Sequence, residues 1–150
     1  MRLFTASIGR ALALTAALFS SAAMAEQMIS DGQYEIHYNA FNSSFITPEV
    51  AQLNGLVRSK YRALVNVSVL EMQEDGSKKA TSAIVSGQAS NLLNQVQKLE
   101  FKPIDEGQAL YYIGSFRFTE DEQLKIRLSV QPDPNKPAYS IEFDQRFYVD

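Results

Sequence analysis

The chain has 150 residues, no cysteine and one histidine, and its 14 basic and 17 acidic residues give a net charge of −3. Without cysteine there is no thiol nucleophile and no disulfide, and a single histidine cannot build a multi-histidine metal site. The acidic balance argues against binding nucleic acid or anionic membranes through charge.

The first 25 residues have the pattern of a secretory signal peptide. Arg2 and Arg10 flank a short basic start, residues 11–19 form an apolar run with Thr15 as its one polar residue, and an A-x-A motif ending at Ala25 predicts cleavage there. The apolar run falls well short of the ~20 residues that a spanning helix needs, so no stable membrane insertion is expected after cleavage. We expect a periplasmic product of a Gram-negative bacterium, with full secretion as the alternative.

Cleavage after Ala25 leaves residues 26–150, which we expect to form a single domain. Its net charge is −5, because the leader holds two of the basic residues and none of the acidic ones. With no disulfide to stabilise it, the domain must depend on packing of its apolar and aromatic residues.

Alternating apolar and polar residues predict about seven β-strands. The expected strands cover residues 33–41, 60–73, 80–89, 99–102, 109–118, 124–131 and 139–147. The third is rich in Ser, Gly and Ala and is a candidate edge strand, and Pro103 is expected to end the fourth. Residues 90–97 fit either a short helical crossing or an irregular connection.

Turn and cap residues separate these segments. Thr47 and Pro48 predict the start of a short helix that ends at Asn54-Gly55. Asp75-Gly76 predicts a tight hairpin turn. The whole pattern favours an all-β fold, an antiparallel β-sandwich of immunoglobulin-like type with one short helix. A small closed β-barrel with a ligand cavity is the alternative.

The second expected strand is apolar on both faces. Its nominally outward residues Leu64, Leu70 and Met72 need cover from the short helix, a loop or a partner, and the sequence leaves open which of these supplies it.

Four short motifs resemble an uncharacterised protein family. They are Tyr38-Asn39-Ala40, NSSF at residues 42–45, PEV at residues 48–50 and RSKY at residues 58–61. Together with the DG hairpin that follows, they are similar to a domain-of-unknown-function family of short exported proteins of Gram-negative bacteria. The resemblance covers nearly the whole mature chain and implies export and an all-β fold. It implies no assigned activity and no catalytic residue.

His37 is the one candidate for acid–base catalysis, and the alternation places it on the polar face of the first strand. Asp31 and Ser43 could complete a triad, but each lies six residues away, ~20 Å along an extended strand. Acidic turns at residues 74–75, 105–106 and 120–122 could form a weak calcium site only if two of them met. We therefore assign no catalytic residue, metal or cofactor.

Recognition is the remaining class of function. The densest basic and aromatic group, at residues 58–62, lies close in sequence to the polar bend at residues 42–44. This grouping predicts a groove for an acidic or polar partner, lined by His37, Asn39, Asn42, Arg58, Tyr61 and Arg62. The alternative is that these side chains pair with local acids such as Glu49. An exposed sheet edge could also bind an extended segment by strand addition.

The function that we predict is a non-enzymatic periplasmic module that binds a protein or envelope component. The second candidate is a small-ligand carrier with an aromatic-lined cavity formed by Tyr34, Tyr38, Tyr112 and Phe116. An enzyme dependent on His37 ranks third.

Overall fold

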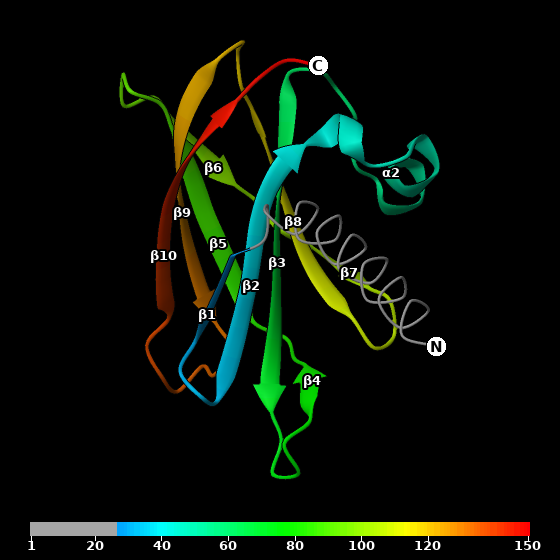
Figure 1. Ribbon diagram of the computed structural model, residues 1–150, viewed down its shortest axis with the longest axis vertical. Helices are drawn as coiled ribbons and strands as arrows, with labels where there is room; N and C mark the ends of the chain where they lie inside the picture. Colours follow the sequence, from blue (N-terminus) through cyan, green and yellow to red (C-terminus); the bar gives the residue numbers. More distant parts are fainter. Residues whose placement is uncertain (1–26) are drawn as a thin grey trace, which may run out of the picture.

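The computed structural model describes residues 27–150, which form two antiparallel sheets packed face to face (Figure 1). The predicted signal peptide and its cleavage after Ala25 lie outside the described residues and stay predictions. Sheet A has the order β1 (Gln27–Ser30), β2 (Tyr34–Asn42), β3 (Arg62–Met72), β8 (Leu110–Arg117) and β7 (Lys102–Asp105), with β4 (Lys78–Ala80) also paired to β3. Sheet B has the order β10 (Tyr139–Phe147), β9 (Glu122–Gln131), β5 (Ile84–Ser90) and β6 (Val96–Leu99).

The predicted all-β sandwich is confirmed, and the two sheets stay separate within residues 27–150, so the barrel alternative is wrong. The described residues form ten strands, where the sequence predicted about seven. The strands β1 and β4 were missed because each is very short and carries little apolar alternation to mark it.

The expected strand at residues 99–102 is two strands that belong to different sheets. Strand β6 ends at Leu99 in sheet B, the chain crosses at residues 100–101, and β7 begins at Lys102 in sheet A. Pro103 therefore lies inside β7 and does not end a strand. Because β7 is the edge of sheet A, the missing N–H of proline can be tolerated there.

The expected strand at residues 80–89 also divides. Its start belongs to β4, and its main part is β5, which lies between β9 and β6 and is not an edge. Small residues permit this central position: a Cβ added at Gly87 would lie 2.5 Å from the backbone oxygen of Arg127, and Ala89 is fully buried. The Ser, Gly and Ala content that suggested a weak edge strand instead allows β9 to lie close against β5.

Residues 90–97 form no helix. They contain the turn of the β5–β6 hairpin, in which Asn94 has φ 59°. The Asn91 side-chain oxygen accepts hydrogen bonds from the backbone N–H groups of Leu93 and Gln95, at 3.0 and 2.9 Å. An asparagine that bonds to the following backbone is typical of turns, so the helical interpretation is wrong.

The predicted helix and hairpin turn are confirmed. A short 3₁₀ helix, η1 (Ser43–Phe45), leads into α2 (Pro48–Asn54), whose N-cap Thr47 accepts the N–H of Val50 at 3.2 Å. The helix ends at Gly55, which has φ 65°. Gly76 has φ 86° in the turn after β3. These positive φ values are the conformations that glycine adopts at low cost.

The core lies between the inner faces of the two sheets and contains alternate residues of β2, β3 and β8 from sheet A and of β9 and β10 from sheet B. Rings from opposite sheets meet in it: Tyr38 packs on Phe143, and Phe116 packs edge-on against Phe147, each with centroids 5.2 Å apart. Burial of aromatic rings supplies much of the stability of a domain that has no cysteine.

The outer face of sheet A is partly covered by the domain itself. Leu64 is 1% exposed and shares the wall of a small cavity of about 170 Å³ with Val50 of α2, Leu56 and Ile113. Leu70 and Met72 are half-buried, and both pair with β4. The helix therefore helps to cover Leu64, whereas β4 lies beside β3 in the same sheet, next to Leu70 and Met72 (Figure 1).

Replacement of Gly87 tests the close contact between β5 and β9. Gly87→Ala places a methyl group against the Arg127 carbonyl oxygen, a backbone atom that cannot rotate away. We expect a loss of about 1–3 kcal/mol in the free energy of unfolding, measured by urea denaturation. The control is Ser86→Ala, an exposed position on the same strand. A Gly87→Ala protein as stable as the control would contradict the packing described here.

Candidate functional site

The structure does not bring the six predicted site residues together in one groove. His37 and Asn39 lie on the outer face of β2. Asn42, at the end of β2, is buried, and its side-chain nitrogen donates to the backbone oxygen of Tyr148 at 2.8 Å and to Asp150 Oδ1 at 3.0 Å. Asn42 thus attaches the C-terminal residues to sheet A.

Arg58 holds the polar bend and the following loop together. Its Nε donates to the Ile46 carbonyl at 2.8 Å, and an Nη donates to the Ser44 carbonyl at 3.3 Å. The buried Ser43 hydroxyl bonds the backbone of Ser59 through both its oxygen and its proton, each at 2.9 Å. The polar bend at residues 42–44 and the segment at residues 58–62 therefore lie in contact, as the sequence suggested. Their polar groups, however, bond the backbone and fix the loop.

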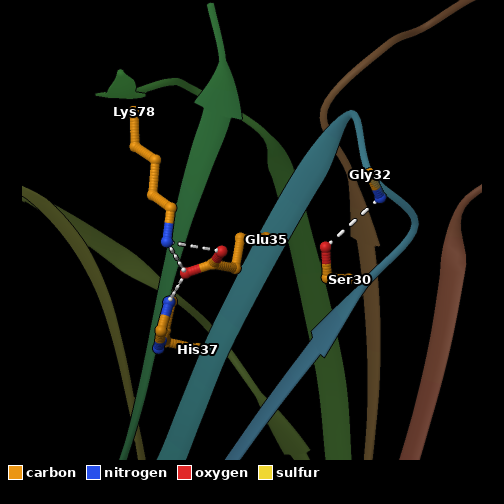
Figure 2. Close-up of polar contacts among 5 residues, drawn as sticks. All are labelled: Ser30, Gly32, Glu35, His37 and Lys78. Atoms are coloured by element: carbon orange, nitrogen blue, oxygen red, sulfur yellow. Dashed lines mark hydrogen bonds and ion pairs between the residues drawn. The ribbon is translucent and has the colours of Figure 1, made fainter. Parts of the chain in front are cut away.

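His37 belongs to a small ionic cluster at the other end of β2 (Figure 2). Its Nε2 lies 2.7 Å from Glu35 Oε1, and Lys78 Nζ lies 2.9 Å from Glu35 Oε2. Hydrogen bonds from Lys78 and then from His37 hold the pKa of the Glu35 carboxyl below its usual value. The cluster attaches β4 to β2.

Asp31 and Ser43, the expected triad partners of His37, make their contacts with other residues. Asp31 accepts the hydroxyl of Tyr139, and Ser43 bonds the backbone of Ser59. Ser30, which lies beside the cluster in Figure 2, instead accepts the Gly32 N–H at 3.2 Å. The geometry offers no support for a Ser-His-Asp arrangement at this place.

A concavity of considerable volume lies at the other end of the sandwich. We call it the end cleft; its volume is about 600 Å³ and it is open to solvent. The residues that line it are Tyr61, Asn91, Gln95, Gln97, Arg117, Phe118, Thr119, Glu122 and Leu124. Phe118 and Leu124 are buried and belong to the core, so the cleft reaches the apolar space between the two sheets.

Gln97 connects the two sheets beside the end cleft. Its side-chain nitrogen donates to the Arg117 carbonyl at 2.8 Å, and its side-chain oxygen accepts the Arg117 N–H at 2.9 Å. One glutamine side chain thus makes the pair of bonds that a neighbouring strand would make. The backbone of Arg117 is held, while its guanidinium makes no hydrogen bond or ion pair with another of residues 27–150.

The β5–β6 hairpin projects beside the end cleft with apolar residues at its tip. Leu92 is 78% and Leu93 is 80% exposed. Two smaller depressions, of about 220 and 200 Å³, adjoin the hairpin, and Asn91 contributes to both of them and to the end cleft. The hairpin therefore adjoins three depressions, the end cleft and the two smaller ones.

Of the six predicted residues, Tyr61 alone lines the end cleft, with 54% of its surface exposed. Sequence reasoning missed the rest of the lining. The signal available was the run NLLNQVQ at residues 91–97, whose adjacent leucines and amides suit neither a buried helix nor a core strand.

The four aromatic residues of the proposed carrier cavity lie in the core and not in the end cleft. Tyr34, Tyr38, Tyr112 and Phe116 are each at most 9% exposed and belong to the main hydrophobic cluster. The Tyr112 hydroxyl accepts the N–H of Ala83 at 3.0 Å. These rings fill the space between the sheets and do not line a cavity between them.

The acidic turns make separate contacts. Asp121 pairs with Arg146 at 2.8 Å, Glu120 accepts the Val149 N–H, and Asp105 accepts the Gly107 N–H. Within residues 27–150, no group of three or more His, Cys, Asp or Glu side chains is placed to hold a metal ion. In the same part of the chain, no helix has the length and apolar character needed to cross a membrane.

The comparisons with known proteins agree with this fold. The model of a domain of unknown function, DUF4426, matches residues 28–150. The chain belongs to this family. A crystal structure of a DUF4426 protein from the Gram-negative bacterium Pseudomonas aeruginosa is 34% identical, has a TM-score of 0.73, and covers 85% of this chain and 98% of its own. The resemblance inferred from the four motifs is confirmed.

More distant structures share the fold alone. FetP from a uropathogenic strain of Escherichia coli, expressed in the E. coli periplasm, is 11% identical with a TM-score of 0.57, covering 83% of this DUF4426 chain and 95% of its own. A copper-bound variant of FetP has the same identity, a TM-score of 0.59, and covers 83% and 96%. A comparison with curated proteins gave no match.

The electrostatics of the β1–β2 turn yield a test at acid pH. Asp31 accepts hydrogen bonds from the Tyr139 hydroxyl and from the backbone N–H groups of Tyr34 and Gln33, which lower the pKa of its carboxyl to about 2. Since this pKa is below that of the unfolded chain, the stabilisation is present above about pH 4 and is lost as the pH falls through 2.

We expect Asp31→Asn to lower the urea midpoint at pH 6 and to converge with the wild type near pH 2. The control is Glu100→Gln, because Glu100 is exposed and is not a partner in the contacts of this turn. A constant difference between Asp31→Asn and wild type across this range would contradict the assignment.

Proposed function

We propose that this DUF4426 protein is a non-enzymatic, exported binding module, and that it holds its partner at the end cleft and the adjoining β5–β6 hairpin. The observation that carries the proposal is a cleft of about 600 Å³ together with two leucines, next in sequence to its lining residue Asn91, that are about four-fifths exposed. The partner is a protein or another component of the cell envelope.

The size and lining of the end cleft suit binding. Ligand sites are typically about 300–1,000 Å³, with an apolar base and a few polar groups that fix orientation. Here Phe118 and Leu124 are the buried apolar residues of the lining, and Gln95, Arg117 and Glu122 are polar residues that also line it. Such a lining favours a ligand with both apolar and polar groups.

The exposed apolar residues favour a macromolecular partner. Leu92 and Leu93 lie next to each other in the hairpin turn, and Val96 is 58% exposed. Contiguous exposed apolar residues that a polar rim surrounds are typical of interaction surfaces. Tyr61, at the cleft, is of a residue type that often dominates the free energy of binding.

Export supports a partner in the periplasm or envelope. The leader pattern at residues 1–25 predicts export, and the resemblance carried by the four motifs implies the same. A net charge of −5 does not favour nucleic acid as that partner. We assign no reaction to His37, because the contacts that it makes with Glu35 are those of a strand-to-strand ionic cluster.

A pair of matched tyrosines tests the location. Tyr61 and Tyr148 are equally exposed, at 54% and 55%, but only Tyr61 lines the end cleft. We expect Tyr61→Ala to weaken capture of the envelope partner by about tenfold or more, because a truncated aromatic anchor costs about 2 kcal/mol or more, while Tyr148→Ala binds as wild type does. The measurement is quantitative cross-linking of purified mature protein in envelope extract, with mass spectrometry of the products.

A variant at the Glu35–His37–Lys78 cluster completes the test. His37→Gln should leave the cross-linked products unchanged, because His37 lies at the other end of β2. Equal capture by Tyr61→Ala and wild type, or loss of capture in His37→Gln alone, would contradict the proposed location.

A further inference from the structure

Two arginines lie directly opposite each other on sheet A beside the end cleft. Arg62 of β3 and Arg117 of β8 are register partners, so both side chains project from the outer face. Directly opposite residues in an antiparallel pair have Cβ atoms about 4.5–5.5 Å apart, and like charges there are destabilising. Arg62 Nη1 donates to the Ser115 hydroxyl at 3.1 Å, which is a neutral partner.

The other arginines of the described residues are all neutralised or bonded to carbonyl groups. Arg127 lies 3.0 Å from its register partner Glu142, and Arg146 lies 2.8 Å from Asp121. Arg58 donates to two backbone carbonyls. Within residues 27–150, Arg62 and Arg117 are therefore the arginines that no carboxylate or carbonyl oxygen satisfies.

An external oxyanion would satisfy this pair. A guanidinium presents a planar fork of N–H donors that matches a carboxylate, and two forks on adjacent strands can hold one anionic group from both sides. The Ser115 hydroxyl, already within 3.1 Å of Arg62, supplies a further donor. The anion also offsets the repulsion between the two guanidinium groups. Because that repulsion destabilises the free protein, its removal makes the free energy of binding more favourable.

We propose that Arg62 and Arg117 form a carboxylate-binding site and that its ligand is an acidic peptide segment of the partner. This inference rests on the proposed function, because it takes the partner to dock at the end cleft, to which Arg117 belongs. Gln97 of β6, the edge strand of sheet B, bonds the backbone of Arg117, and Asn91 and Gln95 line the end cleft. The edge strand of a sheet and side-chain amides are groups that bind peptide backbone.

The charges at this end of the molecule favour a peptide over an anionic membrane. Glu120 and Asp121 lie in the turn between β8 and β9, and Glu122, the first residue of β9, lines the end cleft. Asp150 is bonded to Asn42 and Ser44 at the same end. A flat anionic surface would meet these carboxylates together with the arginines, whereas a narrow peptide can place one carboxylate between Arg62 and Arg117.

The test uses a fluorescein-labelled peptide, Gly-Ser-Asp-Glu-Asp-Ser-Gly, and its matched neutral form, Gly-Ser-Asn-Gln-Asn-Ser-Gly. Fluorescence anisotropy measures both with wild type, Arg62→Gln/Arg117→Gln, Arg62→Lys/Arg117→Lys and Lys98→Gln. Lys98 is the control because it is an exposed cation of β6 that does not line the cleft. Vesicles containing phosphatidylglycerol and inorganic phosphate serve as separate arms.

We expect wild type and Lys98→Gln to bind the acidic peptide at least about tenfold more tightly than the neutral one, and the Gln double variant to lose this preference. The Lys double variant should retain only part of it, because it keeps the charge and loses the fork. The thermal midpoint of the Gln double variant should not fall below that of wild type, because a like-charge pair has been removed.

Three results would overturn the inference. They are equal affinity for the two peptides, no binding of the acidic peptide, and binding of the vesicles or of inorganic phosphate in its place. If the Gln double variant still captures the envelope partner while Tyr61→Ala does not, the binding module stands and the acidic partner is wrong. If neither variant changes capture, the proposed location of binding itself is wrong.

Discussion

The fold depends on the place where the chain passes from one sheet to the other at residues 100–101. Phe101 packs so closely on β8 that a Cβ at Gly114 would lie 3.1 Å from its ring, and Leu99 just before it is fully buried. The side chain of Gln97 then bonds both backbone groups of Arg117. These contacts fix the edges of the two sheets at close distance. The end cleft lies beside this junction, and Gln97 and Arg117 both line it.

Patterns that depend on nearby residues could be read from the sequence. Strands β2 and β9 are long and alternate clearly, and β3 has β-branched residues at regular inward positions, so inward residues such as Ile36, Val67 and Ile126 were identifiable as core. The start of α2 at Thr47-Pro48 and its end at Gly55 follow from cap chemistry, which is also local. The sandwich was predictable because its sheets are antiparallel and connected mostly by short turns.

Features set by contacts distant in sequence could not be read in the same way. Residues 99–102 alternate like one strand, yet their two halves pair with different sheets, and no local pattern marks that division. Asn42 and Arg58 looked like binding groups because they are polar and close together, and the structure uses them to hold the C-terminal residues and a loop. The end cleft combines segments near residues 61, 91–97 and 117–124, whose proximity only the register of β3, β6 and β8 creates.

The central claim is that the partner binds at the end of the sandwich formed by the β5–β6 hairpin and the end of β8. The most direct measurement is NMR chemical-shift mapping of the isotope-labelled mature protein during titration with the captured envelope partner. We expect perturbed amides to concentrate at residues 61–62, 91–97 and 115–122, with those of Glu35, His37 and Lys78 unchanged. Perturbations centred on the Glu35–His37–Lys78 cluster, with the end cleft unchanged, would contradict this claim.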